Sequence, residues 1–445
     1  MKLIQTLKNI WKIEDLRKRL TVTFLFILIY RFGGHVVLPG INPADLEAMR
    51  NFTNSGLMQL LDMFSGGAFG QASIFALGIM PYITASIVIQ LMGMVVPSFQ
   101  KMQREGESGR MKLNQYTRYL TVAILLVQAP AYLMNLQYQV NAAGGHAHIS
   151  GLMMIYLSIV LTAGAMLIMW LGEKMTDKGI GNGISIIILV GILARFPGAI
   201  VQEFTSRLNT AQGGLVMFLV EIVILFAVTA GAVMLTQGTR KVPVQYAKRI
   251  VGNKQYGGAR QYIPLKVNAA NVMPIIFAQA LMFIPITLAG FGARQDASGF
   301  GGWLSRTFGD MNGFWYNVVY FLMIVAFTYF YTAITVRPTQ MAEEMKKNSG
   351  FIPGIKPGKK TAEYLDSIMS RITLPGSIFL GIVAILPAFA RYFGVNQQFA
   401  QFFGGTSLLI TVGVVLDTLQ QIETHLMMHH YDGLMKSGKL KGRNR

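Results

Sequence analysis

Long apolar stretches separated by polar segments run through the whole chain. A helix needs about 20 mostly apolar residues to cross a membrane. Ten stretches have this length and character, at roughly 20–38, 73–95, 117–137, 151–172, 180–204, 215–236, 270–290, 315–335, 374–393 and 402–427. No small-residue cleavage pattern follows the first stretch, so we interpret it as a retained helix. The pattern predicts an all-α integral membrane protein with ten transmembrane helices.

The lead into the second apolar stretch differs from the others. It reads FSGGAFGQ and carries Gly66, Gly67 and Gly70. Glycine is unfavourable inside a helix, so this lead predicts a loose, weakly apolar segment ahead of a long apolar helix. Within that helix, Gly78 and Pro81 predict a bend.

Composition agrees with a membrane protein. Of the 445 residues, 52% are hydrophobic and 13% are charged, whereas soluble domains carry about 25% charged residues. The chain has no cysteine, which excludes disulfides and thiolate chemistry.

The formal net charge of +19 is unevenly distributed. Of the 39 Lys and Arg residues, 32 lie in six alternate polar segments, at 1–19, 96–118, 173–179, 237–268, 337–373 and 428–445. The other loops hold six, among them Arg195 and Arg207, and Arg31 lies near the end of the first helix. The positive-inside rule then places both termini in the cytoplasm.

Two cytoplasmic loops are longer than a turn. The first, at 238–268, alternates apolar and polar residues around central glycines, which predicts a two-stranded hairpin. It holds seven basic residues and no acidic one. Membrane topology alone could account for this charge. A folded basic loop also suits docking of an acidic or RNA-bearing partner.

The second loop, at 337–373, predicts a helical start, a rigid turn and a short amphipathic helix. The turn reads FIPGIKPGKK, and its Pro and Gly residues expose Lys356, Lys359 and Lys360. The amphipathic helix is predicted for TAEYLDSIMSRIT.

Catalytic and metal-binding patterns are missing from the sequence. His425 and His429 are one helical turn apart, but no carboxylate completes a zinc-protease motif, so an interfacial helix face is favoured. The stretch GIGNGIS lacks the lysine of a phosphate-binding loop. We therefore expect no enzyme, no metal site and no cofactor.

A secondary transporter for a small solute is the alternative function. Transporters bury ionisable groups within the membrane, and Glu221 in the sixth span is a candidate, whereas Asp417 lies towards the cytosolic interface. Glu221 alone makes a weak proton relay.

Isoleucines recur beside glycine or proline in several spans. Ordinary membrane packing explains their periodicity, but side chains converging from several helices would form a constriction that seals by dewetting. The set comprises Ile79, Ile83, Ile184, Ile188, Ile276 and Ile410.

Five motifs identify a family. In order they are MFSGGAFGQASIFALGIMPYITASIVIQL, EGESGRMKLNQYTRYLT, MWLGEKMTDKGIGNGISIIIL, YIPLKVNAANVMPIIFA and FGGTSLLI. They closely resemble SecY, the channel subunit of the bacterial protein-conducting translocon. The resemblance implies two pseudo-symmetric halves of five spans around a central pore, and an odd number of spans per half makes them inverted.

The resemblance also implies a division of the chain. The N-terminal half is 1–204, followed by the sixth span at 205–236 and the basic loop at 237–268. Spans seven to ten, with the second loop, occupy 269–427, and the basic tail occupies 428–445.

The resemblance assigns roles to residues within the membrane. The six isoleucines become the pore ring. A plug at about 57–72 includes Phe64, Ser65, Gly66, Gly67 and Gly70. The second and third spans face the seventh and eighth as a lateral gate, with Gln90, Asn268 and Asn271 as polar gate candidates.

The resemblance also implies partners in the bacterial cytoplasmic (inner) membrane. These are the SecE and SecG subunits, the SecA motor ATPase, the ribosome, polypeptides that carry signal sequences, and membrane lipid. Lys248, Arg249, Lys356 and Lys359 are the docking candidates.

Three positions depart from the family pattern. Lys356 replaces a common Arg and keeps the charge but not bidentate recognition. Asn253 also stands where relatives often have Arg, and Asn271 replaces a common glycine.

Overall fold

The computed structural model describes most of the chain. The described residues are 13–41, 62–142, 150–209, 214–246, 249–251, 254–256, 260–270, 272–279, 281–282 and 313–437. They form two compact units, one of Met1–Ala199 with Val414–Arg445 and the other of Ile200–Gly413. Helices α9 (Gly183–Asn209) and α17 (Gly405–Ser437) each contribute to both units.

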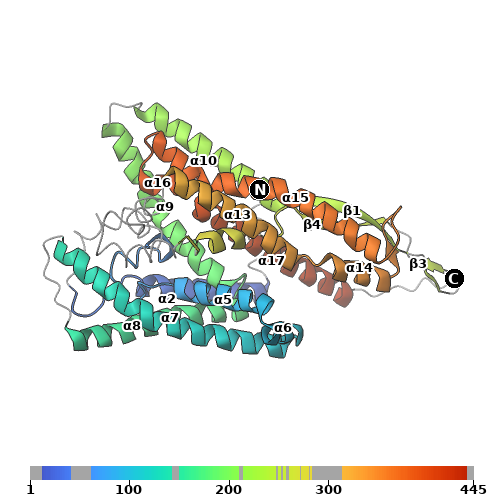
Figure 1. The fold of residues 1–445 in the computed structure, drawn as a ribbon, viewed down its shortest axis with the longest axis horizontal. Helices are drawn as coiled ribbons and strands as arrows, with labels where there is room; N and C mark the ends of the chain where they lie inside the picture. Colours follow the sequence, from blue (N-terminus) through green and yellow to red (C-terminus); the bar gives the residue numbers. More distant parts are fainter. Residues whose placement is uncertain are drawn as a thin grey trace. The chain divides into compact units, whose positions relative to one another are not determined.

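The first unit is a helical bundle around one apolar core. Besides parts of α9 and α17, it contains α2 (Glu14–Gly33), α5 (Met80–Val95), α6 (Pro97–Arg104), α7 (Glu107–Ala142) and α8 (Gly151–Lys178). Helix α7 packs against both α5 and α8, and α2 packs on α8 (Figure 1). Leu125 and Leu133 of α7 meet Leu157 and Leu161 of α8, and all four are fully buried.

The second unit combines helices with a small sheet. Its described helices are α10 (Gly214–Gln237), α13 (Phe314–Thr335), α14 (Pro338–Lys347), α15 (Lys359–Tyr392) and α16 (Gln397–Ala400), with the parts of α9 and α17 that belong here. Helix α13 packs along α15, and α14 packs on the start of α15 (Figure 1).

The predicted hairpin in the first basic loop is confirmed. Strand β1 (Thr239–Tyr246) pairs antiparallel with β4 (Arg260–Lys266), with Val242 opposite Ile263. Between them, β2 (Arg249–Val251) pairs with β3 (Lys254–Tyr256). The sequence did not predict β5 (Gly350–Phe351), which comes from the second basic loop and pairs with the end of β1.

A core under this sheet joins the two basic loops. Val242 and Val244 of β1 pack with Met345 of α14, Ile352 and Leu365 in one buried cluster. Alternate burial along β1 puts its other side chains in solvent, as expected of a sheet with one covered face. The two loops are therefore one folded piece.

Two element boundaries differ from the sequence prediction. The second apolar helix begins at Met80 and not at 73, because Gly78 has a positive φ of 56° and Pro81 occupies the first turn. These residues set the start of the helix and do not bend it. The amphipathic segment at 361–373 is also not a separate helix, because α15 continues through Pro375 to Tyr392.

Seven helices of the described residues are long and apolar enough to cross a membrane, or eight if the bent pair Met80–Gly93 and Pro97–Gln103 is one broken span. The first predicted span is helical as α2, but charged residues at both ends shorten its apolar part. The seventh has a helical turn at 273–279, and 283–312 lie outside the described residues. The protein is thus a mostly helical, multi-pass membrane protein, and the count of ten remains a prediction.

Candidate functional site

The segment from Asp62 to Ile79 is a compact insert of successive turns in the first unit. Backbone bonds tie it to the segment after α2: Leu38 donates its N–H to Ala72 O at 2.9 Å, and Ile74 donates to Val36 O at 2.9 Å. Non-helical backbone at membrane depth is tolerated only where protein or water satisfies its polar groups. The predicted plug at 57–72 overlaps this insert at residues 62–72, which we call the plug segment, and we call its surroundings the plug seat; residues 57–61 lie outside the described residues.

Aromatic residues anchor the plug segment in the core. Phe69 is buried between helices and meets Tyr132 of α7 edge to face, with ring centroids 4.8 Å apart. The Tyr132 hydroxyl also donates to Phe69 O at 2.8 Å. From α2, the Tyr30 hydroxyl donates to Ser65 O at 3.2 Å. Each carbonyl also accepts a longer backbone bond from within the insert, Ser65 O from Ala68 at 3.4 Å and Phe69 O from Ala72 at 3.3 Å, so the tyrosines add the shorter bond to each.

Two arginines complete the plug seat. Arg31, in the last turn of α2, donates from Nη1 to Gly66 O at 2.9 Å. Arg195 of α9 forms an ion pair with the Asp62 carboxylate, which also accepts the Gly70 N–H at 2.7 Å. The Asp62 side chain is 6% exposed and that of Arg195 is 35% exposed. Charge counting had placed Arg195 in an outer loop, which is wrong, because it lies within α9.

Glycine is required where the arginines approach. Gly66 and Gly67 have φ values of 66° and 95°, which side chains with a Cβ rarely adopt. A Cβ on Gly66 would lie 3.1 Å from Arg31 Nη1, and one on Gly67 would lie 3.1 Å from Arg195 Nη2. These two glycines therefore serve the close fit of the plug segment in its seat.

The proposed ring isoleucines are divided between the two units. In the first unit, Ile79 and Ile188 are buried, whereas Ile83 and Ile184 are partly exposed. In the second, Ile410 of α17 is buried, and Ile276 lies partly exposed in the helical turn at 273–279. Convergence of all six into one ring remains a prediction.

The gate candidates lie in different surroundings. Gln90 is partly buried in α5 and donates from Nε2 to Ser86 Oγ at 3.3 Å, one turn away in its own helix. Asn268 is buried, and its Oδ1 has no hydrogen-bond partner among the described residues. Asn271 lies outside the described residues. The gate role of these residues remains a prediction.

The docking candidates lie on the folded piece made by the two basic loops. Lys356 and Lys359 are exposed, at a turn in which Gly354 and Gly358 have positive φ. Arg249 begins β2, and Lys248 lies outside the described residues. The predicted exposure of the lysine turn is confirmed.

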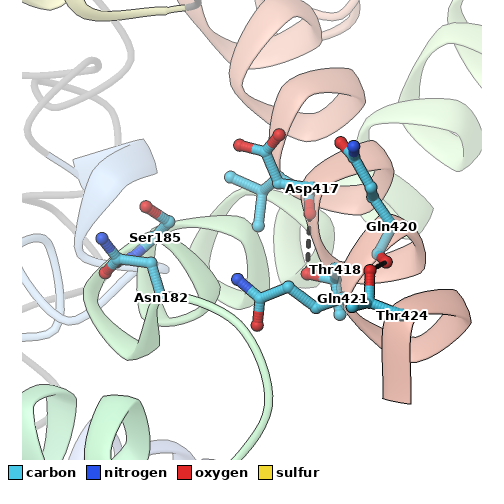
Figure 2. Close-up of a pocket in the computed structure, with 8 residues that line it drawn as sticks. Asn182, Ser185, Asp417, Thr418, Gln420, Gln421 and Thr424 are labelled. Carbon is cyan, nitrogen blue, oxygen red and sulfur yellow. Dashed lines mark hydrogen bonds between the residues drawn. The ribbon is translucent and has the colours of Figure 1, made fainter. Parts of the chain in front are cut away.

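A polar pocket that the sequence did not predict lies where the start of α9 meets α17 (Figure 2). Its volume is about 290 Å³. Gln421 Oε1 accepts the Gly181 N–H at 2.8 Å, and Asn182 Oδ1 accepts the Ile184 N–H at 3.1 Å, so each amide keeps its NH₂ group available. Asp417 is exposed beside them, as expected at an interface. The residues that line the pocket are Asn182, Ser185, Val414, Asp417, Thr418, Gln420, Gln421 and Thr424.

A buried ionic network in the second unit accounts for Glu221. Arg207 of α9 bonds Glu203 of the same helix at 2.9 Å and Glu221 of α10 at 2.5 Å. Glu203 Oε2 also accepts the N–H of Asn396, just before α16, at 2.8 Å. Glu221 therefore joins helices within a network and is not an isolated relay. The described residues contain no cluster of three His, Asp or Glu that could hold a metal.

Known proteins resemble this chain along most of its length. The SecY family model matches residues 73–419. Proteins named protein translocase subunit SecY from Streptomyces galbus and Halalkalibacterium halodurans are 43% and 44% identical. The alignments cover 96% and 98% of this chain, and 98% and 100% of those proteins.

Solved structures share the fold. One described as "The structure of a protein conducting channel" has a TM-score of 0.60 at 19% identity and covers 95% of both chains. Another, of a SecY protein whose plug domain stabilises the closed channel, has a TM-score of 0.62 at 19% identity and the same coverage. A yeast Ssh1 complex on the ribosome has a TM-score of 0.59 at 13% identity, covering 96% of this chain and 92% of that one. With a family model over most of its length and relatives above 40% identity along nearly all of it, the chain belongs to the SecY family of protein translocase subunits.

Proposed function

We propose that this chain is the channel through which a protein translocase passes unfolded polypeptides across the membrane. The observation that carries the proposal is the plug segment, a non-helical insert held at membrane depth by side chains of α2, α7 and α9. Non-helical backbone at membrane depth occurs where protein surrounds it or where it lines a water-filled cavity, as a plug in a channel would. Turns within the segment satisfy many of its own backbone groups, and a few side chains of its neighbours hold it in place, so it can leave as a unit, as a removable seal must.

The pore in this proposal is a narrow apolar ring formed by the six isoleucines between two inverted halves of five spans. A passage for every kind of side chain must bind none of them strongly, and an apolar constriction also excludes ions by dewetting. The chain itself is not expected to change the polypeptide chemically. Family membership and the burial of Ile79, Ile188 and Ile410 support this assignment.

The lateral gate is proposed between the second and third spans on one side and the seventh and eighth on the other. An apolar signal sequence would replace contacts between gate helices, so that signal sequences and membrane helices move sideways into lipid. This requires open and closed states that are close in energy. Gln90, Asn268 and Asn271 are the polar residues proposed to adjust that balance.

The partners are proposed to be SecE and SecG, forming a SecYEG complex, with SecA or the ribosome on the cytoplasmic face. Driving force must come from such partners, because the sequence has no nucleotide-binding motif. The exposed lysine turn and the neighbouring sheet offer a folded basic surface. Structures of related folds on ribosomes support a ribosome partner. With the basic loops on the cytoplasmic face, both termini also lie in the cytoplasm, and the membrane is proposed to be the inner membrane of a bacterium.

Reconstitution tests the function directly. The chain is incorporated into vesicles with its SecE and SecG partners, and SecA, ATP and a precursor with a signal sequence are added. We expect the precursor to become protected from external protease. Absence of protection, together with gradient-driven uptake of a small solute that Glu221→Gln abolishes, would instead support a transporter.

Ion leak tests the ring. Replacing Ile79, Ile184, Ile276 and Ile410 with glycine should raise the small-ion leak of the vesicles. An unchanged leak would remove these isoleucines from the constriction.

A further inference from the structure

The contact between Asp62 and Arg195 differs in kind from the other plug contacts described above. Tyr30, Arg31 and Tyr132 each donate a hydrogen bond to a backbone carbonyl of the plug segment. Arg195 instead pairs with a carboxylate. An ion pair between a guanidinium and a carboxylate is stronger than a hydrogen bond between neutral groups.

The carboxylate belongs to the plug segment and the guanidinium belongs to the wall. Asp62 Oδ1 accepts the Gly70 N–H, a bond that lies wholly within the segment. If the segment leaves its seat as a unit, Asp62 leaves with it. Arg195 stays on α9 and loses Asp62 as its counter-ion.

We propose that Arg195 has an exchangeable partner: the Asp62 carboxylate while the plug segment is seated, and acidic side chains of the passing polypeptide once it has moved. This rests on the proposed channel function and adds a preference for the substrate. A fixed positive charge beside the path favours acidic segments and slows basic ones.

The position of Arg195 along α9 fits this role. It lies twelve residues beyond the start of α9 at Gly183, which is roughly 18 Å along a helix. Ile184 and Ile188, the ring candidates, come first on the same helix. A polypeptide entering from the cytoplasmic end of α9 therefore reaches Arg195 after the isoleucines, where the plug segment had been.

The packing around Arg195 favours an ion pair that can exchange its partner over a permanent ion pair. Its side chain is 35% exposed with the plug segment in place, so this ion pair is less buried than a structural one such as that of Arg207, whose side chain is 7% exposed. Its neighbour on the segment is Gly67, which has no side chain to retain it. Arg31 makes the matching contact from α2 with a neutral acceptor, so its charge does not depend on the segment.

The experiment measures transport of three precursors that differ only in a tract of the mature region, which is neutral, acidic or basic. The tract is placed well beyond the signal sequence, so that recognition is unchanged. With the wild-type chain in SecYEG vesicles, we expect the acidic tract to pass about fivefold faster than the basic one. Arg195→Gln should remove most of this difference, measured as the ratio of acidic-tract to basic-tract transport in the same vesicles, whereas Arg195→Lys should preserve the difference.

Two further variants separate the role of the Asp62–Arg195 ion pair in sealing the channel from the role of the Arg195 charge beside the polypeptide path. Asp62→Asn breaks the ion pair and should raise ion leak, but should keep the preference for the acidic tract because Arg195 remains. Reversing the charge of the wall with Arg195→Glu should reverse the preference, and it should also raise the leak because the new carboxylate repels Asp62. Arg391→Gln, which removes an exposed arginine at the end of α15, is the control and should change neither quantity.

If wild type and Arg195→Gln prefer the acidic tract to the same degree, the inference is wrong. It is also wrong if Arg391→Gln loses the preference for the acidic tract as Arg195→Gln does. Neutral-precursor transport identifies the level of any failure. If no variant transports the neutral precursor, the channel function itself is wrong.

Discussion

Two arginines twelve residues apart on α9 both pair with carboxylates, but the elements that carry these carboxylates differ. Arg195 faces a carboxylate on a segment of turns, and its side chain is 35% exposed. Arg207 lies between carboxylates on α9 and α10, and its side chain is 7% exposed. The residue type, the helix and the kind of partner are the same. What differs is the element that carries the carboxylate.

This difference separates a permanent ionic network, which we call a joint, from an ion pair that can open, which we call a latch. Around Arg207, each group sits on or beside a helix, and Glu203 also binds the backbone ahead of α16. Breaking that network leaves buried carboxylates without a counter-ion, which is costly. Around Arg195, the partner sits on the plug segment, which we propose moves as a unit, and the arginine side chain is 35% exposed. Burial and the mobility of the partner thus determine whether an ion pair is permanent.

The largest effect is expected where the joint is broken. Arg207→Met should destabilise the second unit by about 3–5 kcal/mol, because Glu203 and Glu221 remain buried without their cation. Thermal unfolding in detergent measures the loss. Adding Glu203→Gln and Glu221→Gln to the same chain should recover most of it. A single variant as stable as wild type would mean that the network is not a joint.

A smaller effect is expected where the plug segment is forced from its seat. Gly67→Ala places a Cβ 3.1 Å from Arg195 Nη2 on a backbone with φ of 95°. The strain should be about 1–2 kcal/mol and should unseat the segment, since unfolding a whole helix would cost more. Vesicle conductance should rise while the thermal transition changes little. Gly354→Ala, at a positive φ with nothing nearby, is the matched control for backbone strain alone.

A still smaller change is expected from one neutral contact. Tyr132→Phe removes the hydroxyl that donates to Phe69 O but keeps the ring packing. Because a net buried hydrogen bond contributes about 1 kcal/mol, the plug segment should open several-fold more often. Single-channel recordings count these openings. An opening rate equal to that of wild type would show that the hydroxyl does not hold the segment.

The smallest effect is expected outside the membrane. Lys356→Ala removes one exposed charge from the basic surface and should weaken partner binding only a few-fold, because other cations remain and exposed charges are screened by salt. Binding of SecA or ribosomes should be measured at low and high salt. Ion leak should not change, and a variant that leaks would connect this surface to the seal in a way that the account does not include.

Local patterns in the sequence predicted the elements whose residues are close together in the chain, namely the helices and the hairpin. Apolar length predicted the helices, and alternation around Val242 and Val244 predicted the hairpin, because burial repeats along each element. The glycines of the plug lead were recognised as unsuited to a helix. The plug role itself came from resemblance to the family.

Features that join distant parts of the chain were missed. A two-residue strand such as β5 carries no periodic signal, and its pairing with β1 is fixed only in the folded protein. Arg195 was assigned to a loop because charge counting cannot foresee a partner such as Asp62 far back in the chain. Glu221 was considered as a relay for the same reason, since Arg207 lies in another helix. The polar pocket likewise depends on a contact between Gly181 and Gln421.

The central claim is that the plug segment is a seal held by its neighbours and not a structural element. Deleting residues 60–70 and recording vesicle conductance and thermal stability on the same preparation tests it most directly. We expect a leaking channel that still folds, with a thermal transition close to that of wild type and continued precursor transport. A deletion that unfolds the protein, or one that folds and stays tight to ions, would contradict it.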